Sequence, residues 1–276
     1  MEVTRYETGS SWLETAQRAP TARLATHFND YVGYEEGGGV PLRRREVPHG
    51  RIVLVLGLGE PIDISGCNSS QPAATLTSFV AGLHEGFTTT EHAGRQRGIQ
   101  IDLTPLGAYR LLGLPMCEIA NEVVGLDAFF GRRIERLRDR LASAPTWEDR
   151  FATLDGALQS LIDQGPEPDR SVAWAWQQLD RSAGRVPVST LAEEIGWSRR
   201  HFATRFREHI GLGPKATGRV LRFRRAVKLL DSTDSIATVA ATCGYADHSH
   251  LDRDFRALAG CTPSELRAAR FDGVPC

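Results

Sequence analysis

Two segments near the C-terminal end carry arginine, histidine and hydroxyl side chains at helical spacing. In the first segment the residues at positions i, i+4 and i+7 are Arg200, Thr204 and Arg207. In the second they are Ser249, Arg253 and Arg256, with His248 at the leading end. This spacing places each set on one face of a helix. Such side chains hydrogen-bond to base edges and phosphates, so the chemistry they suit is recognition of DNA.

The opposite face of each predicted helix is apolar. The residues that we expect to be buried are Phe202, Phe206 and Ile210 in the first helix and Leu251, Phe255 and Leu258 in the second. Both segments therefore predict amphipathic helices with a polar outward face.

Both helices belong to a unit that occurs twice in the chain. Residues 191–198 (LAEEIGWS) correspond to residues 239–246 (VAATCGYA), and Gly196 aligns with Gly244. Glycine permits the positive φ of a sharp turn between two helices. A repeated helix–glycine–helix unit predicts two helix-turn-helix motifs, at about residues 187–211 and 235–260.

Positive charge is concentrated around the first unit. Residues 196–230 hold ten Lys and Arg side chains against one acid, Glu208, a net charge of +9. Residues 1–165 hold 16 basic and 21 acidic side chains, a net charge of −5, and the whole chain has −1. A basic region within a nearly neutral chain is typical of phosphate contact.

The repeated unit resembles the DNA-binding domain of AraC/XylS-type transcription regulators over roughly residues 175–270. The matching residues in the first half are Leu191, Ala192, Ile195, Gly196, Trp197, Ser198, Phe202, Phe206, Gly211 and Pro214. Those in the second half are Ile236, Val239, Ala240, Cys243, Gly244, Tyr245, His250, Leu251, Arg253, Phe255, Arg256, Gly260, Thr262 and Pro263. Thr204 departs from the family, which often has Arg there. The resemblance implies two helix-turn-helix units on a rigid helix, entering successive major-groove segments of double-stranded DNA.

The resemblance also implies roles for single residues. The expected contacts to base edges are Arg200, Ala203 and Thr204 in the first recognition helix and His248, Ser249 and Arg253 in the second. Arg199, Arg207 and Arg256 are equally suited to contact phosphate, which positions the domain without reading sequence. His250 directly precedes the buried Leu251, which favours a role in orienting the helix. Trp197 and Tyr245 lie in the turns, where we expect packing.

The spacing between the two units is consistent with one long helix over residues 214–230. Pro214 suits a first helical turn. About 16 residues at about 1.5 Å each give roughly 25 Å. With the widths of the recognition helices added, this length suits two contacts about one DNA turn, roughly 34 Å, apart.

The chain as a whole predicts an α+β protein. It has an N-terminal sensor domain (residues 1–165) and an all-α DNA-binding domain (residues 166–276). Residues 1–115 are β-rich and predict a small barrel or rolled sheet, with strands at 51–58, 75–81 and 97–103 and loops at 37–39 and 66–72. Residues 116–165 form a helical extension. Helices are expected at 108–112, 126–141 and 147–162, and a linker at 164–169.

This arrangement favours a sequence-specific regulator controlled by a small-molecule effector in the N-terminal domain. A small barrel is a natural container for a small ligand, although core packing is the commoner role for its aromatic residues. The aromatic residues considered as lining are Trp12, Tyr31, Tyr34, Phe79 and Phe87. A second copy of the chain and RNA polymerase are further partners that such regulators have, and no cofactor is expected.

An alternative is a bifunctional DNA-binding enzyme with a thiol- or metal-dependent N-terminal activity. Cys117 is the candidate nucleophile, and His84 with Glu85 the candidate base. The histidines considered as metal ligands are His27, His49, His84 and His92, whose spacings do not form H-x-H or H-x-x-x-H, so no metal site is predicted. A third hypothesis is an architectural DNA binder without sequence preference.

Length and composition limit the possible number of domains and the class of protein. A chain of 276 residues has room for two domains, and it has no run of 18 apolar residues that would span a membrane. Five scattered cysteines without C-x-x-C spacing, and no apparent secretory signal, indicate reduced thiols and a cytoplasmic location.

Overall fold

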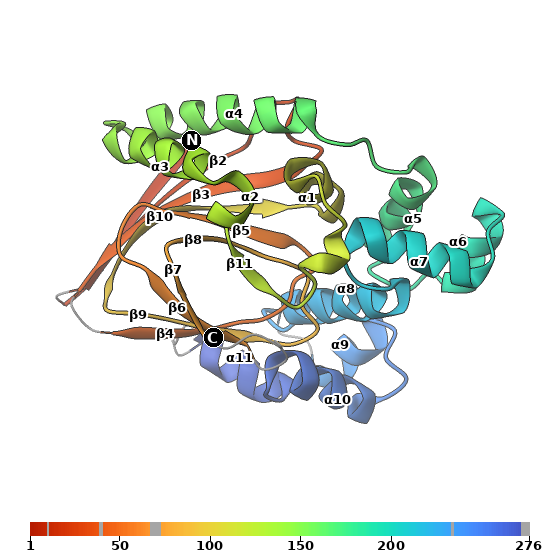
Figure 1. The fold of residues 1–276 in the computed structure, drawn as a ribbon. Helices are drawn as coiled ribbons and strands as arrows, with labels where there is room; N and C mark the ends of the chain where they lie inside the picture. Colours follow the sequence, from red (N-terminus) through yellow and green to blue (C-terminus); the bar gives the residue numbers. More distant parts are fainter. Residues whose placement is uncertain (10, 39–40, 67–72, 233–234, 272–276) are drawn as a thin grey trace.

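Two antiparallel sheets form the first part of the chain (Figure 1). The computed structural model describes residues 1–9, 11–38, 41–66, 73–232 and 235–271. The larger sheet is, in spatial order, β1 (Glu2–Thr8), β2 (Ser11–Arg18), β3 (Phe28–Gly37), β10 (Arg95–Leu103), β5 (Ile52–Gly57), β8 (Ser78–Ala81) and β11 (Val123–Gly125). The smaller sheet is β4 (Leu42–Glu46), β9 (Thr88–His92), β6 (Ile62–Gly66) and β7 (Ala74–Leu76).

The inner faces of the two sheets oppose each other. Successive side chains of a strand point to opposite faces, so β5 sends Val55 inward and Leu54 outward. Val55 and Phe79 of the larger sheet cluster with Ile62 and Ile64 of the smaller one. The N-terminal part is therefore a β-sandwich with an apolar contact between its two sheets. The prediction that this part of the chain is β-rich is confirmed.

Helices cover the outer face of the larger sheet (Figure 1). They are α1 (Pro105–Leu112), α2 (Asp127–Phe130), α3 (Arg132–Ser143) and α4 (Trp147–Gln164). A Cβ added to Gly33 of β3 would lie 2.4 Å from the Trp147 ring, so this strand needs glycine where α4 crosses it. The buried Tyr31 hydroxyl donates to Asp155 of α4 at 2.9 Å.

Three expectations for this part are wrong. The segment 75–81 is two strands, because β7 pairs with β6 in the smaller sheet while β8 pairs with β5 in the larger one. The segment 126–141 is two helices, α2 and α3, interrupted at Gly131, whose φ is 49°. The β-rich region also ends at Leu103 rather than at residue 115, and β11 lies within the expected helical extension. Most of the expected loop at 66–72 lies outside the described residues.

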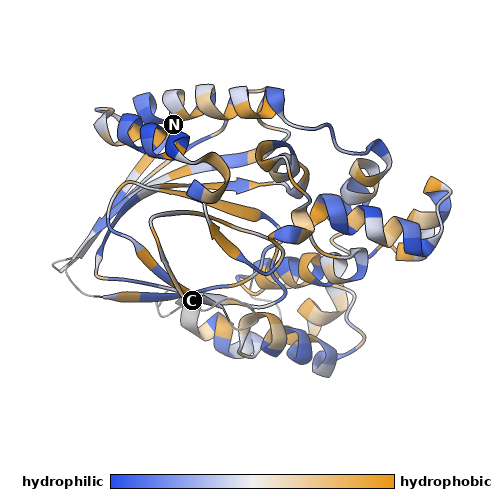
Figure 2. Ribbon diagram, viewed as in Figure 1, coloured by the Kyte–Doolittle hydropathy of each residue, from blue (hydrophilic) through white to orange (hydrophobic). Residues whose placement is uncertain are grey.

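The second part of the chain is helical within the described residues. Its helices are α5 (Arg170–Arg181), α6 (Val188–Ile195), α7 (Arg199–Ile210), α8 (Pro214–Leu229), α9 (Ile236–Thr242), α10 (His248–Ala259) and α11 (Pro263–Phe271). Residues 165–169 connect α4 to α5, at the position expected for a linker. Figure 2 shows hydrophobic and hydrophilic residues alternating along these helices, as in amphipathic helices.

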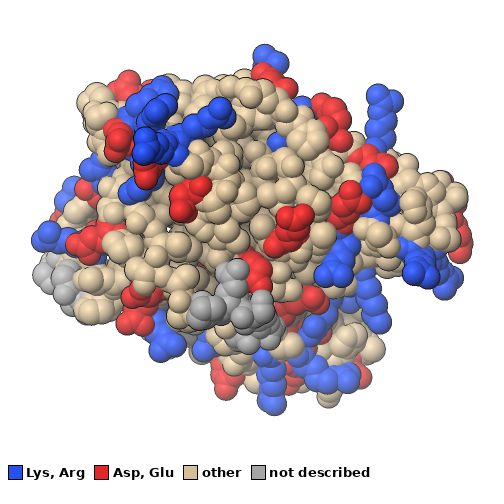
Figure 3. Space-filling view, viewed as in Figure 1, with Lys and Arg blue, Asp and Glu red and all other residues tan. Residues whose placement is uncertain are grey.

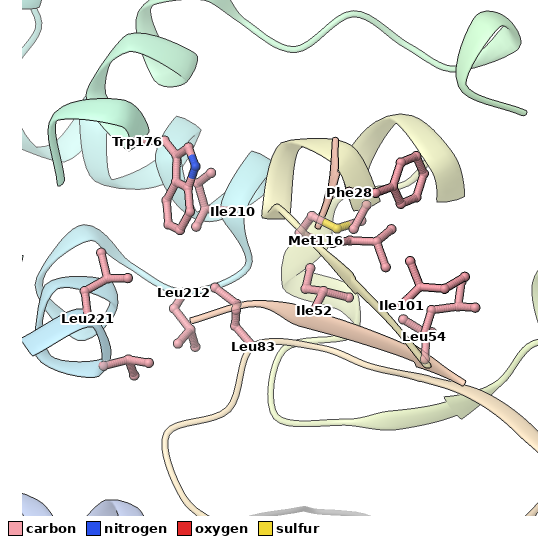
Figure 4. Packing of buried hydrophobic residues seen from close by; sticks show 14 of the residues in the cluster. Phe28, Ile52, Leu54, Leu83, Ile101, Met116, Trp176, Ile210, Leu212 and Leu221 are labelled. Atoms are coloured by element: carbon pink, nitrogen blue, oxygen red, sulfur yellow. The ribbon is translucent and has the colours of Figure 1, made fainter. Parts of the chain in front are cut away.

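One hydrophobic core runs through both parts of the chain. Figure 4 shows Met116, of the short 3-10 helix η1 (Met116–Glu118), and Leu83 of the first part near Ile210 and Leu212 of the second. Tyr109 of α1 stacks on His209 of α7, with ring centroids 4.5 Å apart. The helical part is therefore packed against the sandwich, beyond the covalent connection at residues 165–169.

Candidate nucleic-acid interface

The first helix-turn-helix is made by α6 and α7. Gly196 ends α6 in the left-handed region with a φ of 76°, and its N–H donates to carbonyls of α6. Ser198 then begins α7, because its hydroxyl accepts from the backbone N–H of His201 at 3.2 Å. Phe202 and Phe206 are fully buried, as expected. Glycine and a hydroxyl cap thus fix the turn and the direction of the second helix.

The second unit repeats this construction with α9 and α10. Gly244 has a φ of 77°. Asp247 caps α10 by accepting from the N–H of His250 at 2.7 Å. Leu251 and Phe255 are fully buried. Serine and aspartate are both common N-cap residues, so Ser198 and Asp247 are a sequence signal that could have located the start of each recognition helix.

The predicted DNA contacts lie on the outer faces of α7 and α10. The exposed members of the set are Arg199, Arg200, Thr204, Arg207, His248, Ser249, Arg253 and Arg256, and Ala203 is half-buried. None of these nine points into a packed interior.

Several of these side chains make contacts within their own helix. The Thr204 hydroxyl donates to the Arg200 carbonyl at 3.1 Å, and Arg253 Nε donates to the Ser249 carbonyl at 3.3 Å. His248 Nε2 lies 3.4 Å from a carboxylate oxygen of Asp252. These contacts are local, so they keep the polar side chains on the outer faces of the two helices.

Part of the positive charge counted in residues 196–230 is used inside the protein. Arg205 pairs with Glu208 at 2.6 Å, and Arg224 pairs with Asp180 at 2.7 Å. Arg219 pairs with Asp254 of α10 at 2.6 Å. Because Asp180 and Asp254 lie outside residues 196–230, the net charge of +9 overstates what is available to phosphates. Figure 3 nevertheless shows Lys and Arg side chains projecting from the C-terminal helices at the right and lower edge.

The helix α8 holds the two units together. It spans Pro214–Leu229, so the expected long helix is confirmed to within one residue. Besides the ion pair from Arg219, it contacts α10 through Phe223, whose ring lies 4.8 Å from that of Phe255. On its other side, α8 is joined to α5 by the Arg224–Asp180 pair. These contacts join α8 to the second recognition helix and to α5.

A cavity of about 470 Å³ lies between the two sheets of the N-terminal part. Its apolar wall comes mainly from β5, β6 and β8. Its polar wall comes from β3, β4, β9 and β10 and includes Tyr34, Glu36, Arg44, Thr90, Gln96 and Asp102. Of the aromatic residues considered as lining, Tyr34 and Phe79 face this cavity, whereas Tyr31 is packed under α4. Trp12 lines a separate depression, and Phe87 contacts the helical part.

Hydrogen bonds and charges connect the side chains of the polar wall. Arg44 donates to both carboxylate oxygens of Glu36, at 2.7 and 3.2 Å. Burial raises the pKa of Tyr34 to about 12, so its hydroxyl remains a donor at neutral pH. Burial alone would raise the pKa of Asp102, but the hydrogen bonds and charge around it, mainly from His49, lower that pKa overall. The cavity therefore offers both donors and a charged acceptor to a small polar ligand.

The residues considered for catalysis do not form a recognisable centre in the described part of the chain. Cys117 is a half-buried free thiol in η1. Burial lowers the pKa of His84, whose Nδ1 lies 2.7 Å from the Gly82 carbonyl. Among the described residues there is no group of three or more His, Cys, Asp or Glu suited to a metal ion. No helix that the structure describes is long and apolar enough to cross a membrane. Cys67 and Cys276 lie outside the described residues.

Comparison with known proteins places the same segment among DNA-binding domains. Residues 191–269 match the family model described as a helix-turn-helix domain. The HTH-type transcriptional regulator Rv1931c of Mycobacterium tuberculosis is 30% identical over 148 residues, 50% of this chain and 55% of that protein. The HTH-type transcriptional activator RhaS of Escherichia fergusonii is 34% identical over 97 residues, 35% of this chain and 34% of that protein. The chain thus spans about a third to a half of the length of these relatives.

Two solved structures are also similar. ToxT of Vibrio cholerae aligns with a TM-score of 0.48 and 10% identity over 94% of this chain and 98% of that chain. The DNA-binding domain of AdpA, a global transcriptional factor solved in complex with a target DNA, aligns with a TM-score of 0.33 and 35% identity. That alignment covers 38% of this chain and 93% of that chain.

Proposed function

We propose that the AraC-type helix-turn-helix domain at residues 191–269 makes this protein a sequence-specific, DNA-binding transcription regulator. The observation that carries the proposal is the pair of recognition helices, α7 and α10, which turn polar faces outward and are joined by α8. In this proposal the chain divides into a sensor domain of residues 1–165 and a DNA-binding domain of residues 166–276.

Each recognition helix enters one of two successive major-groove segments. Arg200, Ala203 and Thr204 of α7 meet base edges, and His248, Ser249 and Arg253 of α10 do the same in the second segment. Arg is suited to this role because its guanidinium bonds to guanine O6 and N7 together. Phosphate contacts come from Arg199, Arg207 and Arg256, and they fix the position of the domain without reading sequence. The exposure of the eight polar members of this set supports the assignment.

A small-molecule effector occupies the cavity between the two sheets. The volume of about 470 Å³ is in the range of small-ligand sites, and the combination of one apolar and one polar wall is typical of them. A ligand shifts DNA binding only if its affinity differs between two conformations of the protein.

Further partners in this proposal are RNA polymerase and a second copy of the chain. Relatives named transcriptional activators support the first. The edge strand β1 supports the second, since it exposes Val3 and Tyr6, which are 50% and 61% accessible. Exposed apolar residues on an edge strand are a typical site of association between sheets.

Enrichment of bound fragments from random double-stranded DNA, at a stated salt concentration, tests the function. We expect a narrow consensus made of two conserved segments about one helical turn, roughly 10 base pairs, apart. Binding without enrichment of any sequence would contradict the regulator and support an architectural DNA binder. Failure to bind DNA at low salt would contradict both.

A further inference from the structure

The C-terminal end of α10 is held by the wall of the N-terminal cavity. Arg45 of β4 donates from Nη1 to the carbonyl of Ala259, the last residue of α10, at 3.1 Å. The Arg45 guanidinium carbon also lies 4.9 Å from the centre of the Phe87 ring. A Cβ added to Gly260 would lie 2.5 Å from that ring, so Phe87 packs directly on the turn that ends α10.

The chemistry of this contact suits a helix end. The last carbonyls of an α-helix have no partner within the helix and carry partial negative charge. Arg45 supplies a donor and a positive charge there, while Phe87 fills the space beside the glycine. Together they fix one end of the second recognition helix.

The residues next to Arg45 and next to Phe87 in the sequence line the cavity. Arg44 and Glu46 face the cavity, whereas Arg45 between them reaches α10. Gly86 and Thr88 line the cavity as well, on either side of Phe87. The wall that a ligand would touch and the contact with α10 therefore belong to β4 and to residues 86–88, where β9 of the smaller sheet begins.

The rest of the DNA-binding half is held from the other side of the cavity. Arg51, which directly precedes β5 of the larger sheet, lies 3.4 Å from Asp180 of α5. A Cβ added to Gly50 would lie 2.8 Å from Leu221 of α8. The first recognition helix, α7, contacts α1 through His209 and Tyr109. One unit is thus joined to the larger-sheet side and the end of the other to the smaller sheet, with the cavity between them.

We propose that Arg45 and Phe87 are positioning residues that hold α10 to the smaller sheet, so that the separation of the two sheets sets the orientation of α10 relative to α7. This rests on the proposed function, because it names how the cavity regulates DNA binding. A ligand between the sheets acts on the second DNA segment through this contact.

Hydrogen exchange of the full-length protein tests the contact without DNA. We expect Arg45→Ala to raise exchange in α10 about tenfold, the size of one lost charge-assisted hydrogen bond, and to leave α7 unchanged. Arg43→Ala is the matched control, since Arg43 is an exposed arginine of the same strand. Arg45→Lys keeps the charge and should restore part of the protection. Equal exchange in Arg45→Ala and Arg43→Ala would overturn the proposal, whether or not the protein binds DNA.

Operators that differ only in the spacing between the two segments test the consequence. The wild-type protein should discriminate against one inserted base pair, and Arg45→Ala should lose most of that discrimination without losing affinity for the α7 segment. Val55→Phe places a larger side chain in the cavity from the side of the larger sheet and so fills part of it. This substitution should shift the preferred operator spacing only while Arg45 is present. Additive effects of these two substitutions would overturn the coupling, since contacts that act together are not additive. Absence of any sequence preference in the wild type would instead contradict the proposed function.

Discussion

Arg253 and Arg256 lie three residues apart on α10, are both exposed, and have different proposed partners. The Arg253 side chain bends toward the N-terminal half of the helix, where its Nε bonds to the Ser249 carbonyl. Arg256 lies in the last turn of α10, farther from the end that we propose to enter a groove. Side-chain type alone does not separate a base contact from a phosphate contact. The proposed assignment separates them by position along the helix.

Replacing Arg253 by Ala should cost about 1–3 kcal/mol of binding free energy and relax selectivity at one base pair. Affinity for the selected operator and for its single-base variants measures both effects. Arg256→Ala is the comparison, and we expect it to weaken binding to all sequences alike. A uniform loss in Arg253→Ala would assign Arg253 to a phosphate.

Asp102 gives the cavity wall a pH dependence. It accepts from Gln100 Nε2 at 3.1 Å and lies 3.5 Å from His49 Nε2. Because its pKa is lowered in the folded protein, its contribution to stability is present above the unfolded pKa of about 3.9 and is lost as pH falls through the folded pKa. Asp102→Asn should therefore lower the free energy of unfolding at pH 7, and the difference should shrink below pH 4.

Urea unfolding between pH 3 and pH 7 measures this difference. Glu91→Gln, at an exposed position of β9, is the control, and we expect it to leave the pH profile unchanged. A deficit in Asp102→Asn that is the same at every pH would show that the contribution of Asp102 is not electrostatic.

At the level of elements, glycine decides where the recognition units turn. Gly196 has a φ of 76° and open space where a Cβ would be, so only backbone strain opposes a side chain there. Gly196→Ala should destabilise the protein by about 1–2 kcal/mol, the cost of the left-handed region for an L residue. Chemical denaturation measures it.

Gly156→Ala is a control for which we expect a change in stability of opposite sign. Gly156 lies exposed within α4, with an ordinary helical backbone and open space where a Cβ would be, so Gly156→Ala should stabilise the protein by about 0.5–1 kcal/mol. Destabilisation of similar size by both substitutions would mean that the Gly196 turn carries no special strain.

The sequence predicted elements well where the signal was local. The two helix-turn-helix units and α8 follow from periodic apolar residues, glycine and proline within about 70 residues. The break at Gly131 was missed although its signal is local, a glycine with a φ of 49°. The division of residues 75–81 between two sheets was missed because strand pairing outside the segment decides it. The contact of Arg45 with Ala259 was beyond sequence reasoning for the same reason, since 214 residues separate the two.

At the scale of the whole molecule, the N-terminal sandwich and the DNA-binding helices share one core. Trp176 of α5 and Leu221 of α8 belong to the same buried cluster as Ile52 of β5 (Figure 4). In the proposed regulator, a change in the sandwich would reach the DNA-binding helices through this packing as well as through the linker. The relative position of the two parts is then a property of the fold.

We therefore expect the full-length protein to unfold in a single cooperative transition. Calorimetry measures this, since the calorimetric and van't Hoff enthalpies agree when parts unfold together. Asp180→Ala removes the acceptor shared by Arg51 and Arg224 and should lower the midpoint while keeping one transition. Two separate transitions in the wild type would contradict a shared core.

Base-resolved protection of the selected operator by a single chain tests the central claim most directly. The account predicts two protected segments on one face of the duplex, about one helical turn apart, with base-specific contacts in the α10 segment lost in Arg253→Ala. A single protected segment, or protection that Arg253→Ala leaves unchanged at every base, would contradict recognition of DNA by both helices.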